Sequence, residues 1–361
     1  MLGPFLETLL GGLLTGVLYS LVALGFVLIF KASGVFNFAQ GAMVLFAALT
    51  LARLTGEIDG REVHLANFVI AAAILGTALA FIAWYAWREF VARGGGPAEG
   101  RRMVILAAVG AVIGGAVAWI YGKGSWPLWV ALPATAAIMG VLAYAIERLV
   151  LRHLVNQEGI ILFMATIGLN FFLEGFGEMV WGSNVKKLDV GIPDTSFILS
   201  GVQVNRLELT AAATAAVLVA LLAVFFQTTR IGRALRAVAD DHEAALSLGI
   251  PLKTIWVIVW SVAGLVAIVA GIMWGAKSGV QFSLSLVALK ALPVLILGGF
   301  TSVPGAIAGG LIIGVGEKIG EVYWGPLVGG AIENWFAYVV ALAFLLVRPQ
   351  GLFGERIIER V

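Results

Sequence analysis

Residues 8–30 read TLLGGLLTGVLYSLVALGFVLIF, an apolar run that contains no charged side chain. A helix needs about 20 apolar residues to cross the hydrocarbon core of a bilayer, and this run is long enough. Glu7 is the only charged side chain among the first 30 residues, so the run lacks the basic region that precedes the core of a signal peptide. We interpret residues 8–30 as a retained membrane-spanning helix.

Similar apolar runs continue along the chain. Hydrophobic residues make up 61% of the 361 residues and charged residues 12%, whereas soluble domains contain about 25% charged residues. The mean hydropathy is +1.01. Because the runs are continuous rather than short and alternating, they favour membrane-spanning helices over a membrane β-barrel. The composition predicts an all-α integral membrane protein with a single domain over residues 1–361.

We predict about 11 transmembrane helices in this polytopic bundle. The predicted spans are residues 8–30, 36–53, 66–87, 103–121, 127–147, 159–181, 208–227, 254–276, 284–300, 303–320 and 333–347. The short spans 36–53 and 284–300 could each be re-entrant hairpins, so a count of about 9 to 11 is compatible with the sequence.

The distribution of lysine and arginine predicts the orientation of the bundle. With the N-terminus outside, the segments assigned to the cytoplasm carry about twice as many lysines and arginines as the outer segments. This bias predicts an N-out, C-in topology, and an odd number of spans agrees with it.

Glycines recur at a spacing that favours close packing of helices. Gly12 and Gly16 lie four residues apart in span 8–30, as do Gly310 and Gly314 in span 303–320. Small residues at this spacing let helix backbones approach and gain van der Waals contacts.

Several functional classes lack the residues that they would need. The net charge of +2 gives no indication of a nucleic-acid partner, and the chain has no cysteine. The three histidines, His64, His153 and His242, are far apart in the sequence, which argues against a metal site. No phosphate-binding loop of the form Gly-x4-Gly-Lys-Ser/Thr and no catalytic constellation occurs. We therefore expect no catalytic residue, no metal and no cofactor bound by this chain, with any ATP bound by partner subunits.

Residues 228–253 form the most informative polar segment, TTRIGRALRAVADDHEAALSLGIPLK. Arg233, Arg236 and Asp240 are spaced to share one face of a helix, and Gly249 with Pro251 just beyond it is typical of a helix end. An amphipathic helix of this kind either lies on lipid or docks into a protein groove. The small apolar side chains and mixed charges favour docking.

This segment resembles a known transport element. Glu243-Ala244-Ala245 followed by Gly249 looks like the EAA loop of ABC importer permeases, whose short helix enters a cleft on the ATPase subunit. The wider pattern resembles the permease family for branched-chain amino acids and related substrates, including urea and short amides. The matching stretches are residues 16–25, 37–41, 165–169, 229–239, 289–291, 297–299, 303–306, 309–310 and 348–354. They occur in the family's order and cover most of the chain outside residues 54–140.

The resemblance implies a channel-forming subunit of an ATP-binding-cassette importer without catalysis of its own. The implied substrate is a branched-chain or other amino acid, with urea or a short amide as the alternative. The implied partners are a second homologous permease forming a homodimer or heterodimer, two cytoplasmic ATP-binding subunits, an external substrate-binding protein and the lipid of a bacterial or archaeal cytoplasmic membrane. Relative to the family, residues 66–130 look like an additional pair of helices.

The resemblance also assigns residues to coupling with the ATPase. On the cytoplasmic loop 228–253, these are Arg230, Gly232, Arg233, Arg236, Asp240, Glu243, Ala244 and Gly249.

Polar residues within the predicted spans are candidates for the translocation path. An ionisable side chain at the centre of a membrane helix costs about 2.5 kcal/mol or more, so Lys290 and Glu317 are functional candidates and possible partners of each other. The neutral candidates are Asn37, Gln40, Thr166 and Asn170. Hydrogen bonding between helices is the alternative role for these side chains, and an ion pair between helices is the alternative for Lys290.

Two other functional classes remain as alternatives. An ion-coupled secondary transporter would use an acidic site within the membrane, but it would leave residues 229–250 unexplained. A membrane-embedded enzyme would need a catalytic cluster, which the sequence lacks.

Overall fold

A computed structural model describes residues 2–34, 36–56, 125–151, 154, 157–199, 201–240, 245, 247–250 and 252–354. The predicted spans 66–87 and 103–121 lie outside the described residues, and so does most of the additional pair expected at 66–130. Each of the other predicted spans coincides with a helix to within a few residues.

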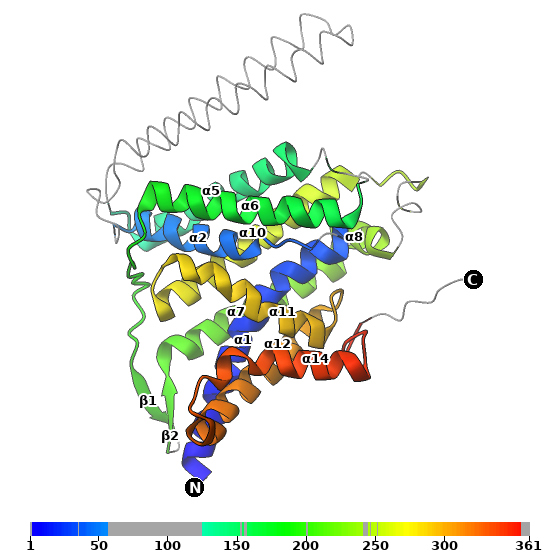
Figure 1. Cartoon of the computed structure of the whole chain (residues 1–361). Coiled ribbons are helices and arrows are strands. Elements are labelled where there is room, and N and C mark those ends of the chain that lie inside the picture. The colour runs from blue at the N-terminus through cyan, green and yellow to red at the C-terminus, as the bar shows by residue number, and fades with distance from the viewer. Residues whose placement is uncertain are drawn as a thin grey trace, which may run out of the picture.

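The described residues form a helix bundle with a small β-hairpin at one end (Figure 1). The α-helices are α1 (Leu2–Ser33), α2 (Gln40–Leu54), α5 (Leu128–Leu149), α6 (Gly159–Trp181), α7 (Arg206–Thr228), α8 (Arg230–Asp240), α10 (Leu252–Ser278), α11 (Val287–Gly298), α12 (Val303–Ile319), α13 (Gly325–Val328) and α14 (Phe336–Val347). Short 3₁₀ turns η2 (Phe282–Leu286) and η4 (Ile332–Asn334) and a π-helical turn η3 (Gly320–Trp324) join some of them. The strands are β1 (Ser196–Leu199) and β2 (Val202–Asn205).

Six helical stretches in the described part are long and apolar enough to cross a bilayer. They are Gly3–Ser33, Leu128–Leu149, Gly159–Trp181, Arg206–Thr228, Ile255–Ser278 and Val303–Val328. The described part also contains three apolar helical stretches that are shorter, Gln40–Leu54, Phe282–Gly298 and Phe336–Val347. The helical membrane architecture is therefore present, whereas the total of about 11 spans and their orientation stay predictions.

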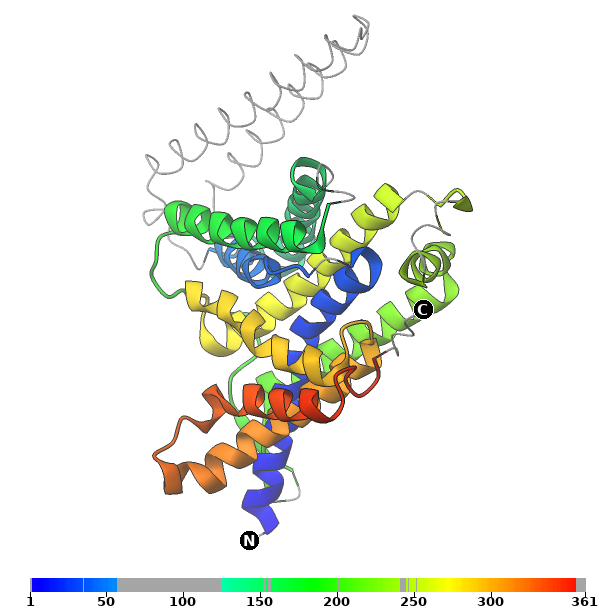
Figure 2. The ribbon, with the colours of Figure 1, turned by 45° about the vertical axis from the view of Figure 1, so that its right-hand side comes forward.

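Helix α1 is the centre of the bundle. It packs against α12, α10, α11 and α7, and Figures 1 and 2 show it running from the end marked N to the vicinity of α8. Glycines on α1 and α12 make the closest of these contacts possible. A Cβ atom on Gly16 would lie 2.6 Å from the carbonyl oxygen of Gly310, and the Ser20 hydroxyl donates to the carbonyl oxygen of Ile307 at 3.2 Å. The predicted close packing of these glycines is confirmed.

Helix α2 is enclosed by protein on all sides. All 15 of its residues are buried, and it packs against α10, α5, α6 and η2. At about 1.5 Å per residue, it is shorter than the roughly 30 Å hydrocarbon core. The predicted span 36–53 is therefore a short internal helix preceded by an irregular stretch, residues 36–39.

The β-hairpin is a departure from the predicted all-α fold. Strands β1 and β2 pair antiparallel from Ser196 opposite Asn205 to Leu199 opposite Val202, and Gly201 in the turn has a φ of 85°. The hairpin directly precedes α7, whose first turn is capped when the Asn205 side chain accepts a hydrogen bond from the Glu208 amide at 3.1 Å. The hairpin lies beside the N-terminal end of α1 (Figure 1).

Candidate translocation and coupling sites

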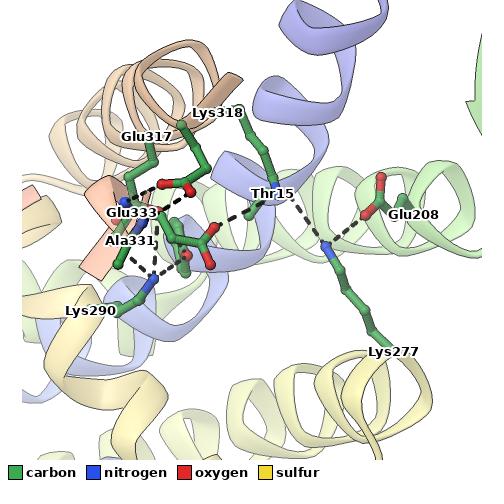
Figure 3. Close-up of polar contacts among 10 residues, drawn as sticks. Thr15, Glu208, Lys277, Lys290, Glu317, Lys318, Ala331 and Glu333 are labelled. Atoms are coloured by element: carbon green, nitrogen blue, oxygen red, sulfur yellow. Dashed lines mark hydrogen bonds and ion pairs between the residues drawn. The ribbon is translucent and has the colours of Figure 1, made fainter. Parts of the chain in front are cut away.

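Lys290 and Glu317 form a charged cluster around Tyr19, which lies near the midpoint of α1. The Glu317 Oε2 atom accepts a hydrogen bond from the Tyr19 hydroxyl at 2.9 Å and lies 3.8 Å from the Lys290 Nζ atom. The Lys290 ammonium also donates to the carbonyl oxygen of Glu333 at 3.1 Å and to the Tyr19 hydroxyl at 3.4 Å. Figure 3 shows these contacts joining α12, α11 and the segment of Glu333. The pairing of Lys290 with Glu317, one of the alternatives from the sequence, is present.

This cluster lines a cavity of about 340 Å³. Thr15 and Tyr19 of α1 form one side, and Trp274 and Lys277 of α10 form another. The remaining walls come from the start of α11 and the end of α12, together with the adjoining short turns. The cavity therefore combines charged groups with aromatic and aliphatic surface, and it occupies the half of the bundle that contains the N-terminus of α1.

A second ion pair joins α10 to α7, and its lysine, Lys277, lines the cavity. The Lys277 Nζ atom lies 2.6 Å from the Glu208 Oε1 atom and 3.3 Å from the Thr15 hydroxyl oxygen (Figure 3). The sequence reasoning assigned Lys277 to an outer segment and did not consider it with Lys290. Its position just after span 254–276 was a usable signal, but its partner Glu208 is 69 residues earlier in the chain.

Glu321 of η3 holds the loop that carries Glu333. Its carboxylate accepts hydrogen bonds from the backbone amides of Ala331 and Glu333, each at 3.1 Å. Ala331 is the one non-glycine residue with a positive φ, 59°, in the described part of the chain. These contacts place the Glu333 carbonyl oxygen where Lys290 can reach it.

Three of the neutral candidates meet elsewhere in the bundle. The Asn37 side chain donates to Gln40 Oε1 at 3.3 Å, and Gln40 Nε2 donates to the carbonyl oxygen of Ala263 at 3.4 Å. The Thr166 hydroxyl donates to the carbonyl oxygen of Phe36 at 3.0 Å and accepts from the amide of Phe38 at 3.1 Å. The two bonds of Thr166 satisfy backbone groups of the irregular, partly buried stretch before α2. None of the three side chains lines the cavity around Lys290, and their role in a path stays a prediction.

Asn170, the fourth neutral candidate, is separate from the other three. Its side chain donates to Glu174 Oε1 at 3.1 Å, one turn further along α6. This contact is local to one helix.

Replacing Thr166 by valine is expected to lower the stability of the bundle. The substitution keeps the shape of the side chain but leaves the partly buried amide of Phe38 without an acceptor, a loss that costs about 1 kcal/mol or more. The midpoint of thermal unfolding in detergent should fall. Thr210→Val on α7 is the control, because the Thr210 hydroxyl donates to the carbonyl oxygen of Arg206 within its own helix. Equal midpoints for both variants would contradict the assigned role of Thr166.

The predicted coupling helix is present as α8, and it folds sharply back onto the end of α7. The Thr229 hydroxyl accepts a hydrogen bond from the Gly232 amide at 3.0 Å and so caps the start of α8. Arg236 donates to the carbonyl oxygen of Phe226, and a Cβ atom on Gly232 would collide with the backbone of that same residue. Gly232 and Arg236, assigned to ATPase coupling, therefore hold α8 against its own bundle.

The two faces of α8 differ in what they contact. Leu235 and Val238 are buried, and α8 packs against α7, α1 and α10. Arg230 and Arg233 are exposed, although Arg233 also donates to the carbonyl oxygen of Thr228 at 3.3 Å. The basic face of α8 is thus the one available to a partner.

The loop beyond α8 is described in part. Asp240 ends α8, whereas Glu243 and Ala244 lie outside the described residues. Gly249 has a φ of 80°, as expected for a glycine that ends a helix, and the preceding Leu248 is 77% exposed. Among the described residues, no three histidine, aspartate or glutamate side chains gather in a way that could hold a metal ion.

A helix bundle with buried charges, a polar cavity and a basic helix at the opposite end defines a multi-pass membrane transport subunit. Residues 101–348 match the family described as the permease component of branched-chain amino acid transport systems. This match covers more than half of the chain, so the chain belongs to that family. The family resemblance inferred from the short sequence motifs is confirmed, and the subunit is a transport component rather than an enzyme.

Curated relatives match almost the whole chain. It is 24% identical over 367 residues to the high-affinity branched-chain amino acid transport system permease protein LivH of Salmonella typhimurium and to LivH of Escherichia coli K12. It is 25% identical over 365 residues to the corresponding permease protein BraD of Pseudomonas aeruginosa. Each alignment covers 99% of this chain and 98% of the relative. No solved structure is significantly similar to it.

Proposed function

We propose that this chain is the membrane-spanning permease of an ATP-driven importer for branched-chain amino acids. An external binding protein delivers the substrate, a second homologous permease completes the path, and two cytoplasmic ATP-binding subunits supply the energy. The observation that supports this proposal is the placement of the two polar elements. The charged cavity lies beside Thr15 and Tyr19 in the middle of α1, whereas the basic helix α8 lies at the end of α1 away from the N-terminus (Figure 1).

The proposed topology is N-out and C-in. α8 packs where α1 and α7 end, and the cytoplasm is the side on which an ATP-binding subunit must dock. The cavity and the β-hairpin then face the outside, where a binding protein can deliver substrate. The arginines of α8 agree with the positive-inside rule in this orientation.

The composition of the cavity favours an amino acid over urea or a short amide. A neutral amide would gain little from the paired charges of Lys290 and Glu317, whereas a zwitterion can bind both. Trp274, Leu286 and Val287 add apolar surface that suits an aliphatic side chain. The names of LivH and BraD point to the same class of substrate.

Uptake by reconstituted proteoliposomes tests the proposal. The permease pair, the ATP-binding subunits and the binding protein should together accumulate L-leucine only when ATP is supplied. Uptake of urea or acetamide in place of leucine would select the amide alternative. Leucine uptake driven by a sodium or proton gradient without ATP would select a secondary transporter.

Cysteine labelling tests the topology. The chain has no natural cysteine, so a single introduced cysteine gives no background. Asn184 and Ser247 are both exposed, near opposite ends of the bundle. A membrane-impermeant maleimide added outside intact cells should label Asn184→Cys directly and Ser247→Cys only after the membrane is opened. Labelling of Ser247→Cys in intact cells would overturn the topology.

A further inference from the structure

Glu317 has a carboxylate oxygen without a donor. The residue is 2% exposed, and its Oε2 atom already accepts from Tyr19. Its Oε1 atom is buried and accepts no hydrogen bond from any described residue. Burying a carboxylate oxygen without a hydrogen-bond donor costs free energy, because the oxygen loses its hydrogen bonds to water and forms none within the protein. Because Glu317 lines the cavity, a rotation of its carboxylate would bring this oxygen to a donor placed there and remove the cost.

Lys290 also keeps unused hydrogen-bonding capacity. An ammonium has three donors, and the contacts to Glu333 and Tyr19 use two of them. The remaining interaction, with Glu317 Oε2 at 3.8 Å, is an ion pair too long for a hydrogen bond. Both members of the pair can therefore accept a ligand without giving up the hydrogen bonds that position them.

The cavity has the size and the apolar wall that a branched amino acid needs. Its volume of about 340 Å³ falls within the range of roughly 300–1,000 Å³ for small-molecule sites. The ring of Trp274 lies against Tyr19 in a stacked arrangement, with centroids 5.5 Å apart, and so presents a rigid apolar surface. Leu286 and Val287 extend that surface beside Lys290.

We propose that this cavity is a substrate station within the permease, in which the Glu317 carboxylate binds the α-ammonium and Lys290 Nζ binds the α-carboxylate of a branched-chain amino acid. From the cavity, the zwitterion spans the two members of the 3.8 Å pair and replaces one long ion pair with two charge-assisted hydrogen bonds. The aliphatic side chain packs on Trp274 and Leu286. This inference rests on the proposed function and adds a particular site to it.

The weakness of the existing pair suits a transport step. A station on a path must bind well enough to accept the solute and weakly enough to release it. When the solute leaves, Lys290 and Glu317 again compensate each other, so neither charge stays unpaired in the membrane. The Tyr19 hydroxyl keeps Glu317 oriented throughout.

Direct binding to the permease complex tests the station. The complex of permeases and ATP-binding subunits is placed in lipid nanodiscs without the binding protein, and radiolabelled L-leucine binding is measured in competition with two analogues. Isocaproate lacks the ammonium group and isoamylamine lacks the carboxylate, so each should compete at least tenfold more weakly than unlabelled leucine with the wild-type complex.

Glu317→Gln is the diagnostic variant, because glutamine keeps the size of the side chain and an acceptor for Tyr19. Leucine binding should weaken about 10- to 100-fold, and the advantage of leucine over isocaproate should largely disappear. In Lys290→Met, the advantage of leucine over isoamylamine should disappear instead. Each variant should lose its preference for leucine over only one of the two analogues. General damage to the fold would not produce this result.

Two further variants keep the test decisive. Glu178→Gln removes a carboxylate from an exposed position on α6 that does not line the cavity, and it should bind leucine like the wild type. Ser283→Trp fills the cavity from an exposed position in η2, and it should abolish leucine binding even if Glu317→Gln does not fold. Wild-type leucine binding by Ser283→Trp and Lys290→Met would overturn the station. If that result is obtained and the wild-type complex still imports leucine with ATP, the proposed function holds although the cavity is not a substrate station.

Discussion

Substitution of Gly249 by valine is expected to abolish leucine uptake while the membrane bundle stays folded. Gly249 has a φ of 80°, a conformation that a β-branched residue adopts only at a cost of about 1 kcal/mol or more. The loop after α8 should therefore change its path just where the ATP-binding subunit is proposed to dock. ATP-driven uptake in proteoliposomes and co-purification of the ATP-binding subunit measure the effect.

Among the described residues, the strain expected at Gly249 comes from its backbone. No atom of these residues lies within 4 Å of a Cβ built there. Gly182→Val is the control, because Gly182, with a φ of 73° and a ψ of 167°, also disfavours valine and has equally open surroundings at the proposed outer end of α6. Uptake lost equally in both variants would show that strain, and not position, is responsible.

Charge reversal at Glu243 is expected to have the same outcome for a different reason. The resemblance to the EAA loop places Glu243 at the contact with the ATP-binding subunit, where a cation would leave a partner charge unpaired. Binding-protein capture of leucine should be unchanged, whereas substrate-stimulated ATP hydrolysis should fall. If Glu243→Arg and Gly249→Val both retain wild-type hydrolysis and uptake, the segment after α8 is not the coupling element.

Substitution of Gly314 by valine is expected to prevent the bundle from assembling. A Cβ atom on Gly314 would lie 2.5 Å from the Gly16 nitrogen and 2.6 Å from the carbonyl oxygen of Gly12. Both neighbours are backbone atoms of α1, so no side chain can rotate away to make room. Overpacking of a core typically costs about 1–3 kcal/mol, and a collision between two backbones lies at the upper end or beyond. Size-exclusion chromatography in detergent should show little monodisperse protein.

Gly11→Val is the control for this effect. Gly11 lies on the same helix as Gly12, but no atom of the described residues lies within 4 Å of a Cβ built there. The variant should therefore purify like the wild type and unfold at a similar temperature. A well-folded Gly314→Val would contradict the assigned close contact between α1 and α12.

The apolar helices of the described part were predictable because lipid imposes one rule on every span. Each span needs about 20 apolar residues in a row, and this requirement is local to the segment. The helix at 230–240 was predictable on the same local basis, from its spacing of charged and apolar residues. The β-hairpin at 196–205 was missed, since two strands of four residues each carry too weak an alternation to stand out among long apolar runs.

The candidate site was predictable only in part. An ionisable residue inside a span attracts notice on energetic grounds, which is why Lys290 and Glu317 were singled out. Asn37, Gln40 and Thr166 were noticed because a polar side chain within a span needs a partner. In the structure, Thr166 bonds the backbone before α2, and Asn37 bonds the Gln40 side chain. Polarity within a span shows that a partner exists, and it does not say whether that partner is backbone, side chain or solute.

The sequence by itself determined the membrane class, the family and the approximate span limits in the described part, because these depend on runs of neighbouring residues and on short motifs. Only the tertiary structure decided that Tyr19, Lys290 and Glu317 share one cavity with Lys277, and that Lys277 forms an ion pair with Glu208. These residues come from α1, α7, α10, α11 and α12, and their meeting depends on how closely the glycines of α1 and α12 allow the helices to approach. That approach is set by packing between distant segments, and no local pattern of apolar and polar residues encodes it.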